Sequence, residues 1–169
     1  MTGAVRRIVL TPDSARTVQH TAAEADDGAE TGGILLGRVD RDGSAHVRHA
    51  GTPGPAAIRA PDYFLRDLAH ARLLADAAFR ADGSIWIGEW HTHLRSDAVP
   101  SPLDVHTYLT LLSDPVLAFD VVIAIVVGPL FPTSTAATRA TGWACTAAGL
   151  AAVPIESEHP LIPNRNPVT

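Results

Sequence analysis

The sequence predicts a single α/β (α+β) domain in which a mixed central β-sheet is flanked by helices. Segments with strand patterns alternate with segments of helical spacing along the chain. The nearly continuous valine and isoleucine run of residues 119–127 is typical of a central strand buried on both faces. A length of 169 residues suits one domain. We place this domain at residues 1–149 and expect an irregular, proline-rich C-terminal tail over residues 150–169.

The first third of the chain predicts a strand, a helix and a β-hairpin. Residues 6–10 alternate weakly as a strand, and Thr11 followed by a proline is typical of a helix N-cap and first turn. Glu30 follows this helix directly. The glycine-bracketed apolar run of residues 31–37 predicts a strand whose backbone packs closely against a neighbour. A turn then leads to residues 45–50, which alternate as the hairpin partner.

The rest of the chain predicts a loop rich in proline and glycine, a helix, a strand, a second helix and two further strands. Apolar residues at helical intervals favour the first of these helices from Asp62 onward. A serine followed by a proline marks the start of the second helix. In order, the six segments are residues 51–61, 62–82, 84–93, 101–113, 119–127 and 141–147.

Composition argues against several classes of protein. The net charge is -5, the isoelectric point is about 5.8 and no basic cluster is present, so nucleic acid is not expected as a partner. The apolar runs are far shorter than a membrane span or a signal-peptide core, so we expect a cytoplasmic protein without membrane association. The only cysteine, Cys145, lies in an apolar run and is expected to be a small buried side chain. Metal chemistry would therefore depend on histidine and carboxylate.

His91, His93 and Asp104 form the candidate metal site. On a strand, side chains at positions i and i+2 point to the same face, so both imidazoles can reach one ion. Asp104 lies three residues after Ser101, the predicted helix N-cap, where a carboxylate also stabilises the helix N-terminus. Capping and metal binding are compatible, because the helix would hold the carboxylate still. Two histidines and a carboxylate suit catalytic zinc, which typically keeps its fourth position for water.

Hydrolysis at such a site also needs a base that takes a proton and returns it to the leaving amine. Glu30 and Glu89 both lie in apolar sequence contexts. Glu89 shares the predicted strand face of His91 and is a candidate for the base, for a partner of a ligand or for a residue at the rim of the site. Residue types alone leave both carboxylates open. His46 and His49 lie in a surface-like pattern, and we do not expect them to bind metal.

The order and spacing of these residues resemble the JAMM signature of the JAB/MPN+ metallopeptidases, in particular a bacterial deubiquitinase-like branch. That signature has a glutamate, then His-x-His, seven residues, and Ser-x-x-Asp, as this chain does. The flanking sequences also resemble the family: Thr-Gly-Gly-Ile-Leu-Leu-Gly follows Glu30, and Gly-Glu-Trp precedes His91. The likeness spans residues 4–147. One departure is Leu94, where the family usually has a proline, which affects loop stiffness more than chemistry.

The resemblance implies a JAB/MPN-like domain with a cytidine-deaminase-like layout, and it implies a role for each residue. By this resemblance, His91, His93 and Asp104 hold one zinc ion per chain, Glu30 is the general base, and Ser101 helps to stabilise the oxyanion.

The resemblance also implies a substrate class. Enzymes of this kind act as zinc-dependent (iso)peptidases that hydrolyse the bond after the C-terminal glycine of a ubiquitin-like protein, often an isopeptide bond to lysine. A glycine-rich tail can add as an extended strand beside such a site. Small bacterial relatives accompany homologues of ubiquitin-activating and ubiquitin-conjugating enzymes, which are the further partners expected here.

Three alternatives stay open. A second branch of the family hydrolyses a sulfur-carrier protein and releases an amino acid. A RadC-like protein, associated with DNA repair, shares a related pattern but typically reads His-Asn-His-Pro, unlike His-Thr-His-Leu in this chain. A non-catalytic MPN scaffold binds partners and usually lacks motif residues, whereas all five are present here.

Overall fold

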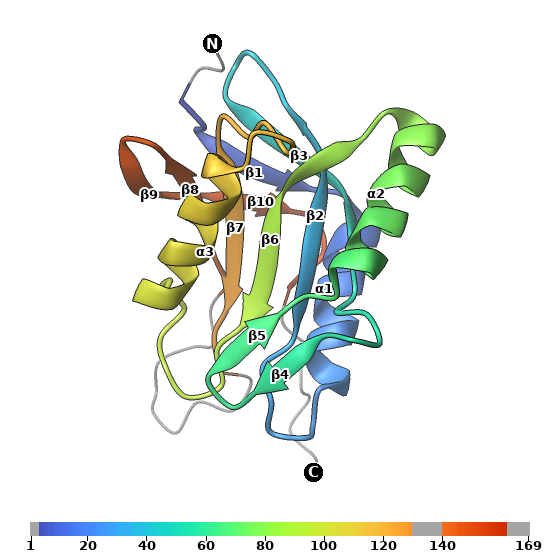
Figure 1. The fold of residues 1–169 in the computed structure, drawn as a ribbon, viewed down its shortest axis with the longest axis vertical. Coiled ribbons are helices and arrows are strands. Elements are labelled where there is room, and N and C mark those ends of the chain that lie inside the picture. The colour runs from blue at the N-terminus through green and yellow to red at the C-terminus, as the bar shows by residue number, and fades with distance from the viewer. Residues whose placement is uncertain (1–3, 130–139, 162–169) are drawn as a thin grey trace.

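A mixed sheet of eight strands lies at the centre of the computed structural model, which describes residues 4–129 and 140–161 (Figure 1). The strands follow the order β10-β1-β3-β2-β6-β7-β8-β9. β1 runs parallel to β10 and β3, and β6 runs parallel to β7, whereas the other neighbours are antiparallel. The predicted mixed-sheet class is confirmed. The strand bounds are β1 Arg7–Leu10, β2 Gly32–Val39, β3 Ser44–Ala50, β6 Ile85–Thr92, β7 Val122–Val127, β8 Ala140–Thr146, β9 Gly149–Val153 and β10 Ile155–Ser157.

In the described part of the chain, three helices cover the two faces of this sheet, with α1 on one face and α2 and α3 on the other (Figure 1). α1 packs on β1, β2 and β3, α2 on β2 and β6, and α3 on β7 and β8. Thr11 caps α1 by accepting a hydrogen bond from the amide of Ser14, as the sequence predicts. The helices are α1 Pro12–Glu24, α2 Leu68–Asp82 and α3 Pro102–Ser113.

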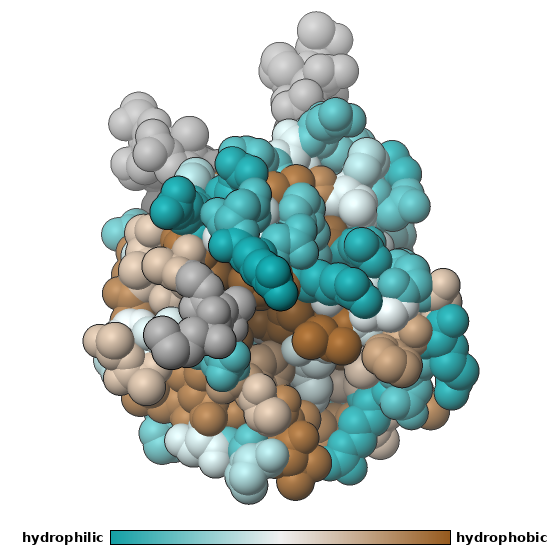
Figure 2. All heavy atoms as spheres, turned by 90° about the horizontal axis from the view of Figure 1, so that it is seen from above, coloured by the Kyte–Doolittle hydropathy of each residue, from teal (hydrophilic) through white to brown (hydrophobic). Residues whose placement is uncertain are grey.

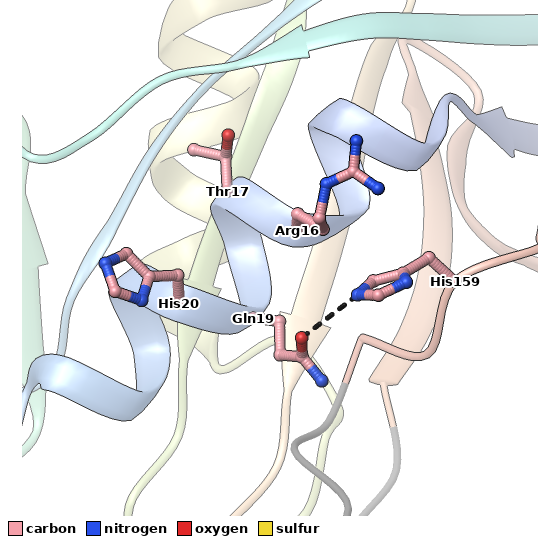
Figure 3. Close-up of a pocket in the computed structure, with 5 residues that line it drawn as sticks. All are labelled: Arg16, Thr17, Gln19, His20 and His159. Atoms are coloured by element: carbon pink, nitrogen blue, oxygen red, sulfur yellow. Dashed lines mark hydrogen bonds between the residues drawn. The ribbon is translucent and has the colours of Figure 1, made fainter.

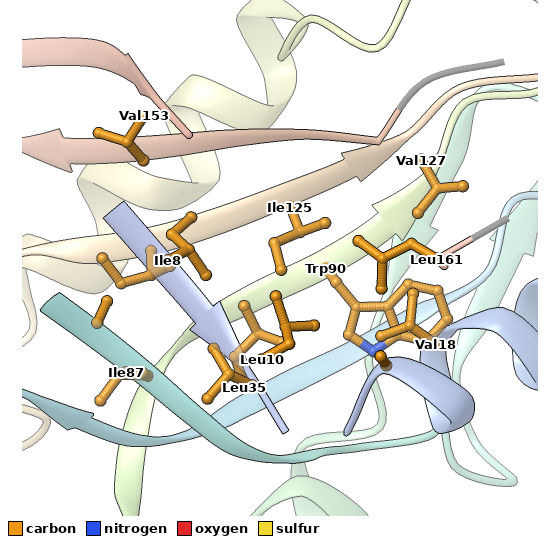
Figure 4. Close-up of a cluster of buried hydrophobic side chains, with 14 of the residues drawn as sticks. Ile8, Leu10, Val18, Leu35, Ile87, Trp90, Ile125, Val127, Val153 and Leu161 are labelled. Atoms are coloured by element: carbon orange, nitrogen blue, oxygen red, sulfur yellow. The ribbon is translucent and has the colours of Figure 1, made fainter. Parts of the chain in front are cut away.

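β7 is buried on both faces. Ile123 and Ile125 belong to the hydrophobic cluster under α1, which Figure 4 shows, while Val122 and Ala124 pack under α3. Every residue of the strand is less than 1% exposed. Burying a side chain of this size contributes about 1.5–3 kcal/mol to stability. The unbroken apolar run therefore fixes β7 beside β6, the strand on which the site is built.

A β-hairpin replaces the start of the predicted second helix. Ile58–Ala60 forms β4 and Tyr63–Leu65 forms β5, and the two pair as a separate antiparallel sheet. The prediction of a helix over residues 62–67 is therefore wrong, and so is part of the predicted loop before it. The helix starts later because the carboxylate of Asp67 accepts a hydrogen bond from the amide of His70 and caps α2 there.

The predicted irregular tail is wrong for residues 150–157. β9 extends the sheet beyond β8, and β10 returns to the opposite edge, where Ile155 lies in register with Ile8 of β1. The sheet therefore continues past residue 149. Residues 162–169 of the predicted tail lie outside the described part of the chain.

The structure also bears on the expected burial of the cysteine and on the length of the helices. Cys145 is buried and only 1% exposed, as predicted. Among the described residues, no helix is long and apolar enough to cross a membrane. In the end view of Figure 2, hydrophilic residues gather across the upper half and the right side, whereas hydrophobic residues are frequent at the left and centre. The ion pair between Arg7 of β1 and Asp42 of the β2–β3 turn, 3.2 Å long, lies at the end of the sheet away from the C-terminus of β6 (Figure 1).

Candidate metal centre

The C-terminal end of β6 carries both candidate histidines. His91 lies within the strand and His93 directly after it, where the amide of His93 donates to the carbonyl oxygen of Val127 on β7 (2.8 Å). The two residues are 5% and 4% exposed. Their Nε2 atoms lie 3.0 Å apart. The i, i+2 spacing thus brings two buried imidazoles to one point, as the sequence predicts.

α3 brings the third candidate ligand. The Ser101 hydroxyl accepts from the amide of Asp104 (3.2 Å), and the Ser101 amide donates to Oδ2 of Asp104 (2.6 Å), so the two residues form a capping box. The predicted N-cap is confirmed. The same Oδ2 lies 3.2 Å from Nε2 of His93 and 3.3 Å from Nε2 of His91. Capping therefore holds the carboxylate oxygen beside both histidines.

These three atoms fit a metal ion. Their separations of 3.0, 3.2 and 3.3 Å form a nearly equilateral triangle. Tetrahedral zinc with bonds of about 2.0–2.1 Å would place its ligands about 3.3 Å apart. Among the described residues, this group alone gathers three histidine, cysteine or carboxylate ligand atoms for an ion. Nitrogen and oxygen donors of this kind suit zinc, and three of them leave one position of a tetrahedron open.

A hydrogen bond on the far side of the ring prepares His93 for this role. Nδ1 of His93 lies 2.7 Å from the carbonyl oxygen of Asp97, an acceptor only, so Nδ1 carries the proton and donates it. In the neutral form of the ring, which is the form that binds metal, Nε2 would then present its lone pair to an ion placed between Asp104 and His91. This arrangement is common among metal-binding histidines, where it sets ring orientation and raises ligand basicity.

The electrostatics of the group favour a negative aspartate. Burial alone would raise the pKa of Asp104, but hydrogen bonds to His91 and His93 outweigh this effect and hold the pKa well below its ordinary value. Burial lowers the pKa of His93, but its hydrogen bonds to Asp104 and to the carbonyl oxygen of Asp97 outweigh burial and leave the pKa raised. A cation at this point would interact with the same carboxylate that raises the pKa of His93.

Glu30 lies beside the group, on the loop just before β2. Gly32 lies opposite His91 in the β2–β6 pairing, and the Thr31 amide donates to the hydroxyl of Thr92 (2.9 Å), while the Thr92 amide donates to the carbonyl oxygen of Thr31 (2.8 Å). Glu30 is only 7% exposed. Burial raises its pKa to about 7, and the charges of His93 and Asp104 also shift it. The carboxyl group thus lies within electrostatic reach of the three candidate ligands.

Glycine is required where β2 passes the site. A Cβ on Gly32 would lie 2.2 Å from the carbonyl oxygen of Trp90 and 2.8 Å from the ring of Phe64. Only glycine therefore lets β5, which carries Phe64, close over β2 next to Glu30.

Glu89 has a different partner. Its carboxylate forms an ion pair with the guanidinium of Arg66, and the two side chains are 12% and 11% exposed. The guanidinium also lies 5.2 Å from the ring centre of Trp86, and burial lowers its pKa to about 10. Of the two carboxylates that the sequence left open, Glu89 is engaged by Arg66, and Glu30 is the one whose pKa responds to the candidate ligands.

The structure adds residues that sequence reasoning missed and sets others aside. The backbone carbonyl of Asp97 accepts a hydrogen bond from His93, and the hydroxyl of Thr92 accepts one from the amide of Thr31. No sequence motif predicts either contact. His46 and His49 lie on β3, where they pair with Asp40 and Asp82. They lie outside the group of His91, His93 and Asp104.

A second hollow lies on the α1 side of the sheet, on the opposite face from α3 (Figure 3). Oε1 of Gln19 and Nε2 of His159 lie 3.2 Å apart across it. The residues that line it are of polar or charged types, and none of them belongs to the candidate metal group. The lining residues are Arg16, Thr17, Gln19, His20 and His159.

Comparisons with known proteins agree with this picture. A family model described as prokaryotic homologues of the JAB domain matches residues 12–144, the segment that contains every candidate site residue. Among solved structures, the solution structure of the protein DSY2949 from Desulfitobacterium hafniense is similar, with a TM-score of 0.66. The identity is 22%, and the match covers 90% of this chain and 93% of that chain, so this likeness concerns the fold alone. No curated protein matches the chain.

Proposed function

Because the chain belongs to the prokaryotic homologues of the JAB domain, we propose that it is a zinc-dependent (iso)peptidase. In this proposal it hydrolyses the bond after the C-terminal glycine of a ubiquitin-like protein. The observation that carries the proposal is the pairing of an open, three-ligand group with a buried glutamate of raised pKa. A structural zinc site would have a fourth protein ligand, and the described residues offer none beside His91, His93 and Asp104.

The ion would be held by Nε2 of His91, Nε2 of His93 and Oδ2 of Asp104. When bound, it would act as a Lewis acid and lower the pKa of a coordinated water to about 7. The chain itself supplies the orientation of these ligands. The strand pairing of β6 fixes the histidines, and the capping box of α3 fixes the carboxylate.

Glu30 handles the proton in this proposal. A general base works best when its pKa lies near the working pH, and burial places the pKa of Glu30 at about 7. As a carboxylate it accepts the proton of the attacking water, and as an acid it returns that proton to the leaving amine. The position of Glu30 just before β2, beside the end of β6, suits both transfers.

Ser101 completes the proposed site. Its hydroxyl oxygen accepts from the amide of Asp104, which leaves the hydroxyl proton available to a substrate oxygen. A donor aimed at the developing oxyanion typically contributes a factor of about 100–1,000 to kcat. Because Ser101 is the residue before α3, the donor is fixed by the same turn that fixes Asp104.

The substrate class rests on family membership together with the shape of the site's surroundings. β4 and β5 pair with each other in a separate two-stranded sheet, and β4 also accepts a hydrogen bond from the Glu30 amide through Ala60, so among the described strands β5 has an edge without a strand partner. An extended, glycine-rich tail can pair with such an edge through its backbone, without bulky side chains. A folded ubiquitin-like protein that ends in glycine has a tail of this kind.

The test uses purified protein loaded with zinc. The substrate is ubiquitin whose C-terminal glycine is joined by an isopeptide bond to the lysine of a fluorescent peptide. A second substrate carries one amino acid on the same glycine through a main-chain amide. Cleavage of the first supports isopeptidase activity, and cleavage of the second alone indicates the amino-acid-releasing reaction of the sulfur-carrier branch.

Two variants separate the roles. Glu30→Gln should keep one zinc per chain and lose about 100-fold or more in kcat, whereas Asp104→Ala should lose both zinc and hydrolysis. A fully active Glu30→Gln protein with stoichiometric zinc would refute the assignment of the base. Cleavage of neither substrate by the zinc-loaded wild type, at any enzyme concentration, would favour a binding scaffold.

A further inference from the structure

Arg59 of β4 forms hydrogen bonds with the loop that carries Glu30. Its Nε donates to the carbonyl oxygen of Glu30 (2.9 Å), and its Nη2 donates to the carbonyl oxygen of Ala29 (3.1 Å). Nη1 and Nη2 also reach the two carboxylate oxygens of Asp27, at 2.9 and 3.0 Å. One guanidinium thus binds three residues of the loop between α1 and β2.

The same loop is fastened at two further points. The amide of Glu30 donates to the carbonyl oxygen of Ala60 on β4 (2.8 Å), so both backbone polar groups of Glu30 are held by β4. The carboxylate of Asp27 also accepts from the amide of Ala29 (3.2 Å), which closes the loop around the guanidinium. These bonds matter because residues 25–31 belong to no helix or strand.

The chemistry of the contact requires arginine. A guanidinium presents five donors in a fixed plane, whereas lysine offers a single ammonium that cannot span two carbonyls and a carboxylate together. The side chain of Arg59 is 25% exposed and that of Asp27 is 53% exposed, so their mutual ion pair contributes little to stability by itself. The hydrogen bonds to the two carbonyl oxygens are the part of this contact that fixes the position of Glu30.

We propose that Arg59, oriented by Asp27, is a positioning residue that holds the backbone of Glu30 so that its carboxyl group meets the candidate metal centre. This inference rests on the proposed function, because it assumes that Glu30 transfers the proton. A misplacement of about 1 Å in a reacting group can cost about 100-fold in rate. Loss of Arg59 should therefore act on catalysis through Glu30, without touching the three candidate metal ligands.

Kinetics of the zinc-loaded protein test this inference. Arg59→Ala should lower kcat about tenfold or more, with KM within about twofold of the wild type and one zinc still bound per chain. The kcat of Arg59→Lys should lie between those of the wild type and Arg59→Ala, because lysine keeps the charge and one donor group. In a Glu30→Gln background, Arg59→Ala should lower the residual rate no further. Arg7→Ala removes a comparable arginine–aspartate pair at the far end of the sheet and serves as the matched control.

A second readout does not depend on activity. Amide hydrogen exchange in a peptide spanning residues 28–33 should accelerate about tenfold in Arg59→Ala and stay unchanged in Arg7→Ala. We call the contacts of Arg59 with the carbonyl oxygens of Ala29 and Glu30 the clamp. Unchanged amide exchange in Arg59→Ala would show that the clamp does not hold this loop, whether or not the protein is a peptidase. Faster exchange with unchanged kcat would overturn the positioning role. If the wild type hydrolyses nothing but exchange accelerates as expected, the clamp stands and only the proposed function fails.

Discussion

Replacing Glu30 with glutamine should stabilise the metal-free protein. Burial raises the pKa of Glu30 from 4.5 to about 7 in the folded protein, whereas the unfolded chain keeps an ordinary carboxyl group. Between these two values the folded protein binds more protons than the unfolded chain, so its stability falls as pH rises through this window. The full cost is present above about pH 7 and absent below about pH 4.5. Glutamine has a similar shape and carries no charge to desolvate.

The magnitude follows from the size of the pKa difference. A separation of about 2.5 pH units, at about 1.36 kcal/mol per unit, corresponds to about 3 kcal/mol. Glu30 is only 7% exposed, so solvent screening reduces this figure little. For a domain of this size, about 3 kcal/mol corresponds to a rise in Tm of about 6–12 °C. The gain should shrink when zinc is bound, because a cation favours the carboxylate.

Urea denaturation of chelator-treated wild type and Glu30→Gln measures the difference directly. At pH 8 the variant should unfold at the higher urea concentration, and at pH 4.5 the two curves should nearly coincide. Glu156→Gln, which changes an exposed carboxylate on β10, is the control and should alter stability by less than about 0.5 kcal/mol. Equal stability of wild type and Glu30→Gln at pH 8 would mean that water solvates the Glu30 carboxylate, and the argument for a raised pKa would be lost.

Three other perturbations have defined outcomes. Glu89→Ala leaves the buried guanidinium of Arg66 unpaired and should lower the free energy of unfolding by about 3 kcal/mol. The double variant Arg66→Met, Glu89→Leu removes both charges and should lower it far less. Equal losses in free energy would argue against a desolvated ion pair. Gly88→Ala would place a methyl carbon 1.8 Å from the carbonyl oxygen of Ile123, so soluble protein with a native circular dichroism spectrum would contradict the β6–β7 pairing. Added zinc should raise the Tm of the wild type but not of Asp104→Ala, and an equal rise in both would place the ion elsewhere.

The sequence predicts strands and helix starts best where a local signal is strong. Thr11 and Ser101 are N-caps followed by prolines, and both helices begin where these pairs predict. The hairpin at residues 58–65 was missed because Phe64 and Leu68 are spaced as on a helix. The amino-acid sequence of this segment fits both a helix and a β-hairpin. The hairpin forms where Gly32, which is distant in sequence, leaves room for Phe64 to pack.

β10 illustrates a second limit. Its three residues carry no alternating pattern of their own, and the strand exists because β1 offers it a parallel edge. Ile8 and Ile155 are separated by most of the chain, and parallel pairing over such a distance leaves no turn signal between them. Local periodicity therefore cannot detect it.

The candidate site divides in the same way. His91, His93 and Asp104 follow a spaced motif, and the structure brings them together. The roles of Glu30 as base and Ser101 as oxyanion donor stay predictions. Arg59 could not be found from the motif, because its contribution consists of hydrogen bonds to backbone oxygens whose positions the sequence does not reveal.

The capping box between Ser101 and Asp104 has a consequence for how the protein acquires its ion. Oδ2 of Asp104 accepts a hydrogen bond from the Ser101 amide and lies beside both imidazoles. The entropy cost of ordering this carboxylate is therefore met when α3 forms, and not when metal binds. A site assembled in this way should load zinc without waiting for a rearrangement, so its rate of loading should depend on access of the ion to the end of β6.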